Sequence, residues 1–264
     1  MIDVIKGSCI GTFHLKNQIP NQDYCGYVKK DDCVFACIAD GVSLADSQGT
    51  ISHAHFASKY ICKFAVECFN NLYINKSQLY NDLLIIIYHM CKKKLEQYIK
   101  DHHLIENYYH STFILTLYKE GYLYYCYIGD SGIIGFKNNN IFCITPKQKD
   151  GLFVDSILGN QKPLYGVVQV DGYILMTDGI YEAANRNYCS NGFDNRIIND
   201  LLFIGKEKRM IRFLNQLPEG YTNDDKTVVV VKETGRFAER FSEEPVSHEE
   251  YMKNFLNEIQ NITF

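Results

Sequence analysis

Apolar residues along the chain follow two patterns, and each predicts a different element. Short runs rich in β-branched and aromatic residues predict strands, whereas apolar residues recurring every three or four positions predict helices. The predicted strands cover residues 4–14, 23–30, 33–39, 111–120, 122–129, 132–137, 141–145, two segments on either side of Asp171 and Gly172, and 227–232. The predicted helices cover residues 49–71, 77–100, 179–185, 194–204 and 206–217. Strand clusters that flank two helical regions indicate an α+β fold with antiparallel sheets.

The segments between these elements carry turn signals. Lys119-Glu120-Gly121 predicts a hairpin turn, and Asn138 to Asn140 predict another. Residues 146–165 are polar and contain Gly and Pro, so we expect a surface excursion there.

The composition changes at Glu233, which divides the chain into a domain of residues 1–232 and a charged tail of residues 233–264. Within the tail, Ser247 and Glu250 form a capping box that predicts a short amphipathic helix. The apolar face of that helix comprises Tyr251, Phe255, Leu256 and Ile259. Docking on its own domain is favoured over binding to a partner, and both interpretations stay open.

An acidic residue stands at the end of several predicted strands. Asp40, Asp130 and Asp178 each follow an apolar run and precede Gly or Ser, whereas Asp224 and Asp225 directly precede one. If these strands share one sheet system, their ends bring several carboxylates together. Clustered oxygen ligands suit hard divalent cations such as Mg²⁺ or Mn²⁺.

Charge and cysteine content restrict the class of protein. The formal net charge of −4 gives no electrostatic reason to expect nucleic acid or an anionic membrane as a partner. No stretch approaches the roughly eighteen apolar residues of a membrane span, and the N-terminus lacks the pattern of a secretory signal. We therefore expect a cytoplasmic protein whose ten cysteines are reduced and mostly buried.

The acidic motifs also occur in a characteristic order, "PNQDYCGY", "CIADGVS", "YIGDSG", "LMTDGIYEA" and "NDDKTVVVV". In this order and spacing the sequence resembles the PPM-type (type 2C) metal-dependent serine/threonine protein phosphatases, and in part a bacterial subgroup of them. The resemblance covers residues 5 to 232. It implies a four-layer α/β/β/α sandwich, in which two antiparallel sheets pack face to face, a pair of helices lies on each outer side, and the metal site lies at one end.

The resemblance also implies the metal ligands. Asp40 should bridge two ions, Mn²⁺ or Mg²⁺, and the backbone carbonyl of Gly41 should bind the second. Asp178 and Asp224 should complete the shell of the first ion. The small residue after Asp40 allows the backbone to approach an ion closely.

Two further aspartates match family positions. Asp23 corresponds to an acidic position that orients metal-bound water, and Asp130 to one that binds a weaker third metal in related enzymes. The implied chemistry uses two ions roughly 3.5 to 4 Å apart, which lower the pKa of a bridging water. The resulting hydroxide attacks phosphorus in line, without a covalent phosphoenzyme.

The side of the site that would recognise phosphate departs from the family pattern. No arginine precedes "NQD", and Gln18 stands near the expected position, so His14 or Lys16 is the candidate replacement. Val42 cannot act as a general acid, Gln22 stands where a metal-binding glutamate often occurs, and "GDSG" lacks the arginine that often follows. The predicted catalytic residues are Asp40, Asp178, Asp224, His14 and Lys16.

Two functions follow from these residues. The first is hydrolysis of phosphoserine and phosphothreonine on a phosphoprotein, which a cognate serine/threonine kinase would supply. The alternative is a catalytically weak or inactive pseudophosphatase that acts as a regulatory binding module. The presence of the clustered aspartates favours the enzyme, because carboxylates held close together repel one another unless a cation neutralises them. The sequence leaves the identity of the substrate and the oligomeric state open.

Overall fold

The structure is a computed structural model of the whole chain. It describes residues 1–30, 32–42, 53–73, 79–138, 140–145, 154–184 and 195–234. The predicted tail helix and part of the predicted excursion at 146–165 lie outside these residues.

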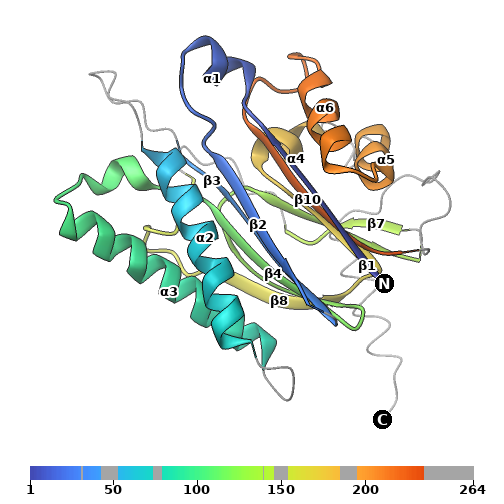
Figure 1. Ribbon diagram of the computed structural model, residues 1–264, viewed down its shortest axis with the longest axis horizontal. Coiled ribbons are helices and arrows are strands. Elements are labelled where there is room, and N and C mark those ends of the chain that lie inside the picture. The colour runs from blue at the N-terminus through green and yellow to red at the C-terminus, as the bar shows by residue number, and fades with distance from the viewer. Residues whose placement is uncertain are drawn as a thin grey trace.

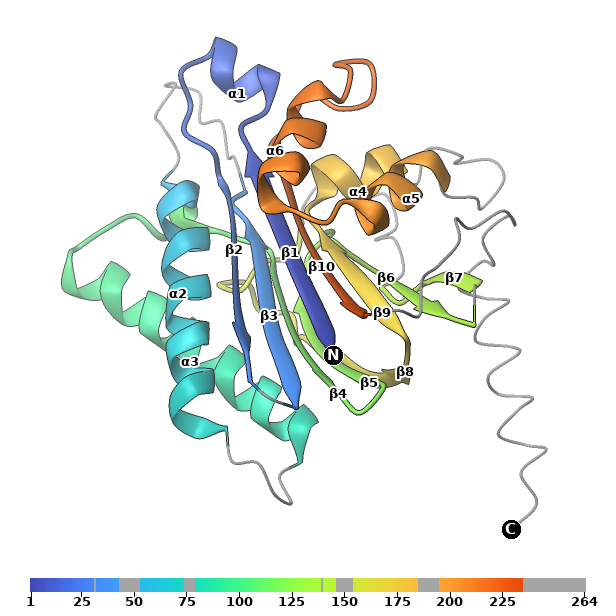
Figure 2. The ribbon, with the colours of Figure 1, turned by 45° about the vertical axis from the view of Figure 1, so that its right-hand side comes forward.

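Two antiparallel sheets form the centre of the molecule (Figures 1 and 2). The first sheet has the order β1 (Ile2–Cys9), β10 (Lys226–Glu233), β9 (Gly172–Met176), β6 (Gly132–Lys137) and β7 (Asn140–Cys143). The second has the order β2 (Asp23–Lys29), β3 (Cys33–Asp40), β4 (Phe113–Lys119), β5 (Tyr122–Ile128) and β8 (Leu164–Gln169). Side chains from both sheets form one buried cluster, so the sheets pack face to face.

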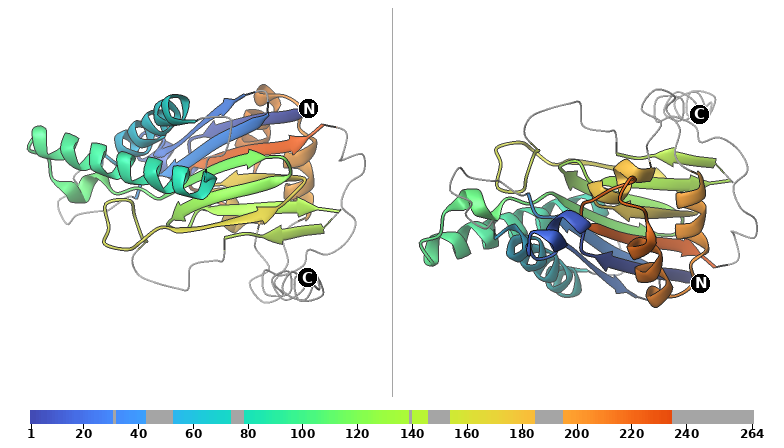
Figure 3. Two further views of the ribbon diagram at one scale, coloured as in Figure 1. Left: turned by 90° about the horizontal axis from the view of Figure 1, so that it is seen from below. Right: turned by 90° about the horizontal axis from the view of Figure 1, so that it is seen from above.

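Helices cover the outer face of each sheet, as Figure 3 shows from above and below. The second sheet packs against α2 (Ala54–Leu72) and α3 (Tyr80–Asp101), which precede the 3₁₀ turn η1 (Glu106–Tyr109). The first sheet packs against α4 (Asp178–Ala184), α5 (Asn195–Phe203) and α6 (Glu207–Gln216). The predicted four-layer sandwich is thereby confirmed. Its second helical layer contains three helices instead of the expected pair, because α4 follows β9 directly.

The apolar pattern explains why these layers form. Every residue of β3 except Asp40 is buried, since the strand has α2 on one side and the other sheet behind it. In α2, buried residues recur every three or four positions from Ala54 to Phe69, which produces one apolar stripe toward the sheet. The interior is therefore mainly apolar, and Asp40 lies at the end of its strand.

One predicted strand is wrong at its end. β1 stops at Cys9 instead of continuing to residue 14, and Thr12–Lys16 form the short helix α1 at the upper end of the sandwich in Figure 1. Gly11 is the N-cap of this helix, and glycine is needed there because an added Cβ atom would lie 2.2 Å from the backbone of Asp224. The predicted turn at Glu120 and Gly121 is confirmed, since both residues have positive φ angles.

The described cysteines agree with the expected reduced state. All nine of them are free and buried, whereas Cys189 lies outside the described residues. Among the helices that the structure describes, none combines the length and the apolar character that a membrane crossing requires.

Candidate metal centre

Asp23 and Asp40 lie directly opposite each other at the end of the β2–β3 ladder. The backbone of Asp40 is held on its other side by β4. The hydroxyl of Ser111 and the amide of Thr112 each donate to the Asp40 carbonyl at 2.8 Å, and the Asp40 amide donates to Thr112 Oγ1 at 3.1 Å. With its backbone fixed on both sides, Asp40 has only its carboxylate free to reorient.

Asp178 and Asp130 approach Asp40 from two other connections. Asp178 follows β9 and begins α4, where its Oδ1 accepts the Gly179 amide at 2.6 Å. Asp130 follows β5. One carboxylate oxygen from each of Asp40, Asp130 and Asp178 lies within 4.8 Å of the others, and all three residues are partly exposed. A cation from solvent therefore has access to three convergent acidic ligands.

Two carboxylate oxygens near this cluster are buried without a hydrogen-bond partner in the described part of the chain, Asp23 Oδ1 and Asp130 Oδ1. The other oxygen of Asp23 accepts a hydrogen bond from Thr177 Oγ1 at 2.7 Å. A buried carboxylate oxygen without a donor is costly unless a cation or water satisfies it. The donor set thus fits a hard divalent ion, directly or through water.

The pKa values of the clustered aspartates reflect the same crowding. Loss of hydration is the first cause that raises the pKa of Asp40 and Asp178 well above the ordinary value, and repulsion from neighbouring carboxylates is the second. Desolvation, with repulsion from Asp225, raises the pKa of Asp23 to about 7. Desolvation also raises the pKa of Asp130. Each raised pKa means that the ionised form of the carboxylate is disfavoured, and a bound cation would favour that form instead.

The two aspartates before β10 have separate surroundings. The Asp224 side chain is 47% exposed, whereas the Asp225 side chain is 2% exposed. Asp224 contributes to the repulsion on Asp40 and Asp178 and so belongs to the cluster electrostatically. Asp225 instead accepts the backbone amides of Gly11 and Gln22, both at 2.6 Å.

Asp225 was not predicted as a site residue, although it stabilises the loop that carries α1. It joins the two ends of residues 11–22, and His14 Nδ1 lies 2.8 Å from its Oδ2. This proximity is the main cause that raises the pKa of His14. The adjacent "DD" pair was the only signal in the sequence, and it did not show which aspartate would be buried.

The two candidate phosphate-binding residues lie in different environments on α1. His14 is buried, and its ring nitrogen faces Asp225. Lys16 is exposed, and its Nζ forms a hydrogen-bonded ion pair with Glu219 at 3.0 Å. The structure therefore exposes Lys16 to solvent and buries His14 against Asp225.

Glycines allow close approach of the backbone at two metal-site motifs. An added Cβ at Gly41 would lie 2.6 Å from the carbonyl carbon of Ala54, and one at Gly179 would lie 2.1 Å from the Asp225 carbonyl oxygen. Gly41 also donates its amide to the Gln22 carbonyl at 3.1 Å. The motifs Asp40-Gly41 and Asp178-Gly179 thus need glycine for packing as well as for the expected access to an ion.

Several solved structures share this fold. The S. agalactiae serine/threonine phosphatase is 14% identical, covers 88% of this chain and 99% of its own, and has a TM-score of 0.64. Stp1 from Staphylococcus aureus is 16% identical, with coverage of 89% and 96% and a TM-score of 0.66. PstP/Ppp from Mycobacterium tuberculosis is 14% identical, with coverage of 88% and 98% and a TM-score of 0.64. The catalytic domain of PstP has been solved with two manganese ions.

Sequence comparison gives the family. No curated protein matches the chain at a significant level. The family model for protein phosphatase 2C, however, matches residues 10–217, which include all the aspartate motifs except the last. The chain therefore belongs to the protein phosphatase 2C family, the metal-dependent protein phosphatases that its acidic motifs predicted.

Proposed function

We propose that this chain hydrolyses phosphoserine and phosphothreonine on proteins with the help of two divalent cations, Mn²⁺ or Mg²⁺. The observation that carries the proposal is the convergence of Asp40, Asp130 and Asp178, whose carboxylate oxygens lie within 4.8 Å of one another. Their raised pKa values mean that this geometry opposes full ionisation without a counter-charge. The two manganese ions in the PstP catalytic domain support the choice of cation.

The proposed ligands follow the family pattern. Asp40 would contact both ions, Asp178 and Asp224 would bind the first, and the Gly41 carbonyl would bind the second. Asp23 would act through water, and Asp130 would hold a weaker third ion. When bound, such ions supply positive charge that offsets the phosphate oxygens and lowers the pKa of water.

The chain's own residues would position these ligands and the substrate. Thr177 donates to one oxygen of Asp23, which leaves the other oxygen available for a metal-bound water. Asp225 accepts hydrogen bonds from both ends of the α1 loop and would thereby help to position Lys16. Lys16 is the proposed phosphate contact, as a point charge without the two-pronged geometry of arginine. The placement of His14 favours a role through Asp225 over direct contact with phosphate.

The second candidate function is that of a pseudophosphatase, a binding module without turnover. Two features favour it. Val42 follows Gly41 where a general acid would be useful, and Lys16 pairs with Glu219 instead of standing as an unpaired cation. The substrate, under either function, would be a phosphoprotein produced by a serine/threonine kinase, and we propose a cytoplasmic signalling role.

The experiment that separates the two candidates uses phosphopeptides. Purified full-length protein is incubated with phosphothreonine, phosphoserine and phosphotyrosine peptides and Mn²⁺, with chelator in a parallel series. If the chain is an enzyme, we expect Mn²⁺-dependent phosphate release from the phosphothreonine and phosphoserine peptides, and no release by the Asp40→Asn variant. Calorimetric Mn²⁺ binding without release from any peptide would contradict it and favour the binding module.

A further inference from the structure

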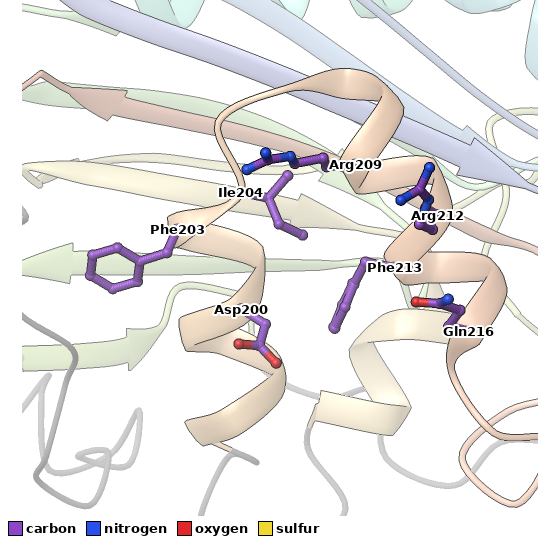
Figure 4. A pocket seen from close by; sticks show the side chains of 7 residues that line it. All are labelled: Asp200, Phe203, Ile204, Arg209, Arg212, Phe213 and Gln216. Atoms are coloured by element: carbon purple, nitrogen blue, oxygen red, sulfur yellow. The ribbon is translucent and has the colours of Figure 1, made fainter.

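A groove lies between α5 and α6, on the outer side of the first sheet, and none of its lining residues belongs to the candidate metal centre (Figure 4). Its apolar residues are Phe203, Ile204 and Phe213, and its cavity volume is about 280 Å³. Small-molecule sites usually measure roughly 300–1,000 Å³. The groove is therefore sized for one or two inserted side chains, as in a helix-in-groove contact.

Two arginines of α6 line the groove, Arg209 and Arg212. Both residues are exposed, and neither forms an ion pair within the part of the chain that the structure describes. Phe203 at the end of α5 is 37% exposed although it is a large apolar residue. Asp200 also lines the groove, so the two arginines leave its lining with a formal net charge of +1, which fits an amphipathic occupant whose carboxylates lie beside α6.

The chain itself leaves the described structure beside this groove. Lys232, near the end of β10, donates from its Nζ to the backbone carbonyl of Leu202, the residue before Phe203. The described residues end two positions later, at Thr234. Residues 235–246 separate that point from Ser247, and twelve residues reach at most roughly 40 Å when extended. The groove therefore lies within reach of the tail.

The tail has the complementary chemistry. Residues 243–258 contain five glutamates and one lysine. Tyr251, Phe255 and Ile259 recur at a spacing of four residues, which in a helix places them on one face. Glu258 follows Phe255 by three residues and would border that face. The tail therefore offers apolar side chains for the groove and carboxylates for its arginines.

We propose that residues 247–259 dock in cis, as an amphipathic helix, into the groove between α5 and α6. Phe255 and its apolar neighbours would fill the groove between Phe203 and Phe213. The glutamates would pair with Arg209 and Arg212. The tail would then add a further helix to the outer layer of the first sheet.

Hydrogen exchange of the full-length protein, read by mass spectrometry, tests this docking. Phe255→Asp places a charge on the apolar face, and Asn257→Asp is the matched control with the same new charge on the opposite side of the helix. We expect Phe255→Asp to accelerate exchange about tenfold in both residues 247–260 and residues 200–216. The control should leave both segments within about twofold of wild type.

The groove is tested in the same way from its own side. Arg209→Glu with Arg212→Glu should accelerate exchange of residues 247–260, while unchanged exchange in β3 and β10 shows that the fold is intact. Exchange in the tail as fast as in an unfolded peptide, in wild-type protein, would overturn the proposal. Protection that disappears on dilution, with dimers in sedimentation, would also overturn it, because the tail would then occupy a second copy.

Discussion

Thr177 donates a hydrogen bond to Asp23 across the interface between the two sheets, with 2.7 Å between Thr177 Oγ1 and Asp23 Oδ2. Thr177 follows β9 of the first sheet, and Asp23 begins β2 of the second. The hydrogen bond is buried, and Thr177 directly precedes Asp178 in the sequence. It therefore links the two sheets beside Asp23 and Asp178 of the proposed metal centre.

Replacing Thr177 with Val should weaken metal binding. The variant keeps the shape of the side chain but removes the hydroxyl, so Asp23 Oδ2 loses the hydrogen bond from Thr177. We expect a loss of about 10- to 100-fold in Mn²⁺ affinity, measured by calorimetry. Thr116→Val is the matched control, because Thr116 is also buried and bonds to the Ala36 carbonyl far from the site. Equal Mn²⁺ affinity in Thr177→Val and wild type would contradict this role of the hydroxyl.

Neighbouring aspartates should respond differently to substitution. Asp225→Ala leaves two buried amides and His14 without their acceptor, so we expect a loss of about 3–5 kcal/mol in the free energy of unfolding. Asp224→Asn removes one charge from a repulsive cluster, so the metal-free protein should keep its stability and lose Mn²⁺-dependent activity. Urea unfolding and a phosphatase assay check both variants. Similar unfolding free energies for the two would show that this division is wrong.

Gly179→Ala should destabilise the fold by about 1–3 kcal/mol or more, because the new methyl group would lie 2.1 Å from the Asp225 carbonyl oxygen. The clash lies beside Asp178, so Mn²⁺ affinity should also fall. Gly205→Ala is the control, since no atom lies within 4 Å of its added Cβ. Thermal unfolding and Mn²⁺ titration of the pair measure both effects. A Gly179→Ala protein as stable as the control would refute the close packing of these two motifs.

The stability of the metal-free protein should fall as the pH rises. Burial and mutual repulsion hold the pKa of Asp23 at about 7 in the folded state, and raise those of Asp40 and Asp178, whereas unfolded aspartates titrate near 3.9. Because these carboxyl groups have a higher pKa in the folded state, their contribution to the free energy of unfolding is complete below about pH 4. That contribution is lost as the pH rises through about 7. Saturating Mn²⁺ should therefore raise the unfolding temperature more at pH 7.5 than at pH 5. An Mn²⁺ effect of equal size at both values would contradict the repulsive cluster.

Local patterns were sufficient to predict the strands, the helices and most of the acidic strand ends, whereas the four layers were implied by the resemblance to the type 2C phosphatases. β3 is apolar and buried from Cys33 to Ala39, and Asp40, the first charged residue after this run, is only partly buried. The end of β3 was therefore predictable from the apolar run itself. The register that places Asp23 opposite Asp40 also follows from adjacent strands joined by a short turn.

The contacts of Asp225 with the loop that carries α1 were not predictable from local patterns. It joins Gly11, His14 and Gln22 to a residue more than 200 positions away, so no local periodicity reports it. The strand expected through residue 14 ended early for a related reason. Gly11 and Phe13 donate their amides to Asp225 and Asn223, and local propensity does not contain these long-range contacts.

Hydrolysis of p-nitrophenyl phosphate tests most directly whether the convergent aspartates make this protein a metal-dependent phosphatase. Wild type is assayed with Mn²⁺, with Mg²⁺ and with chelator, beside Asp178→Asn with Mn²⁺. We expect turnover that requires the metal and falls by more than about 100-fold in Asp178→Asn. Turnover that persists with chelator, or that Asp178→Asn leaves unchanged, would contradict the claim.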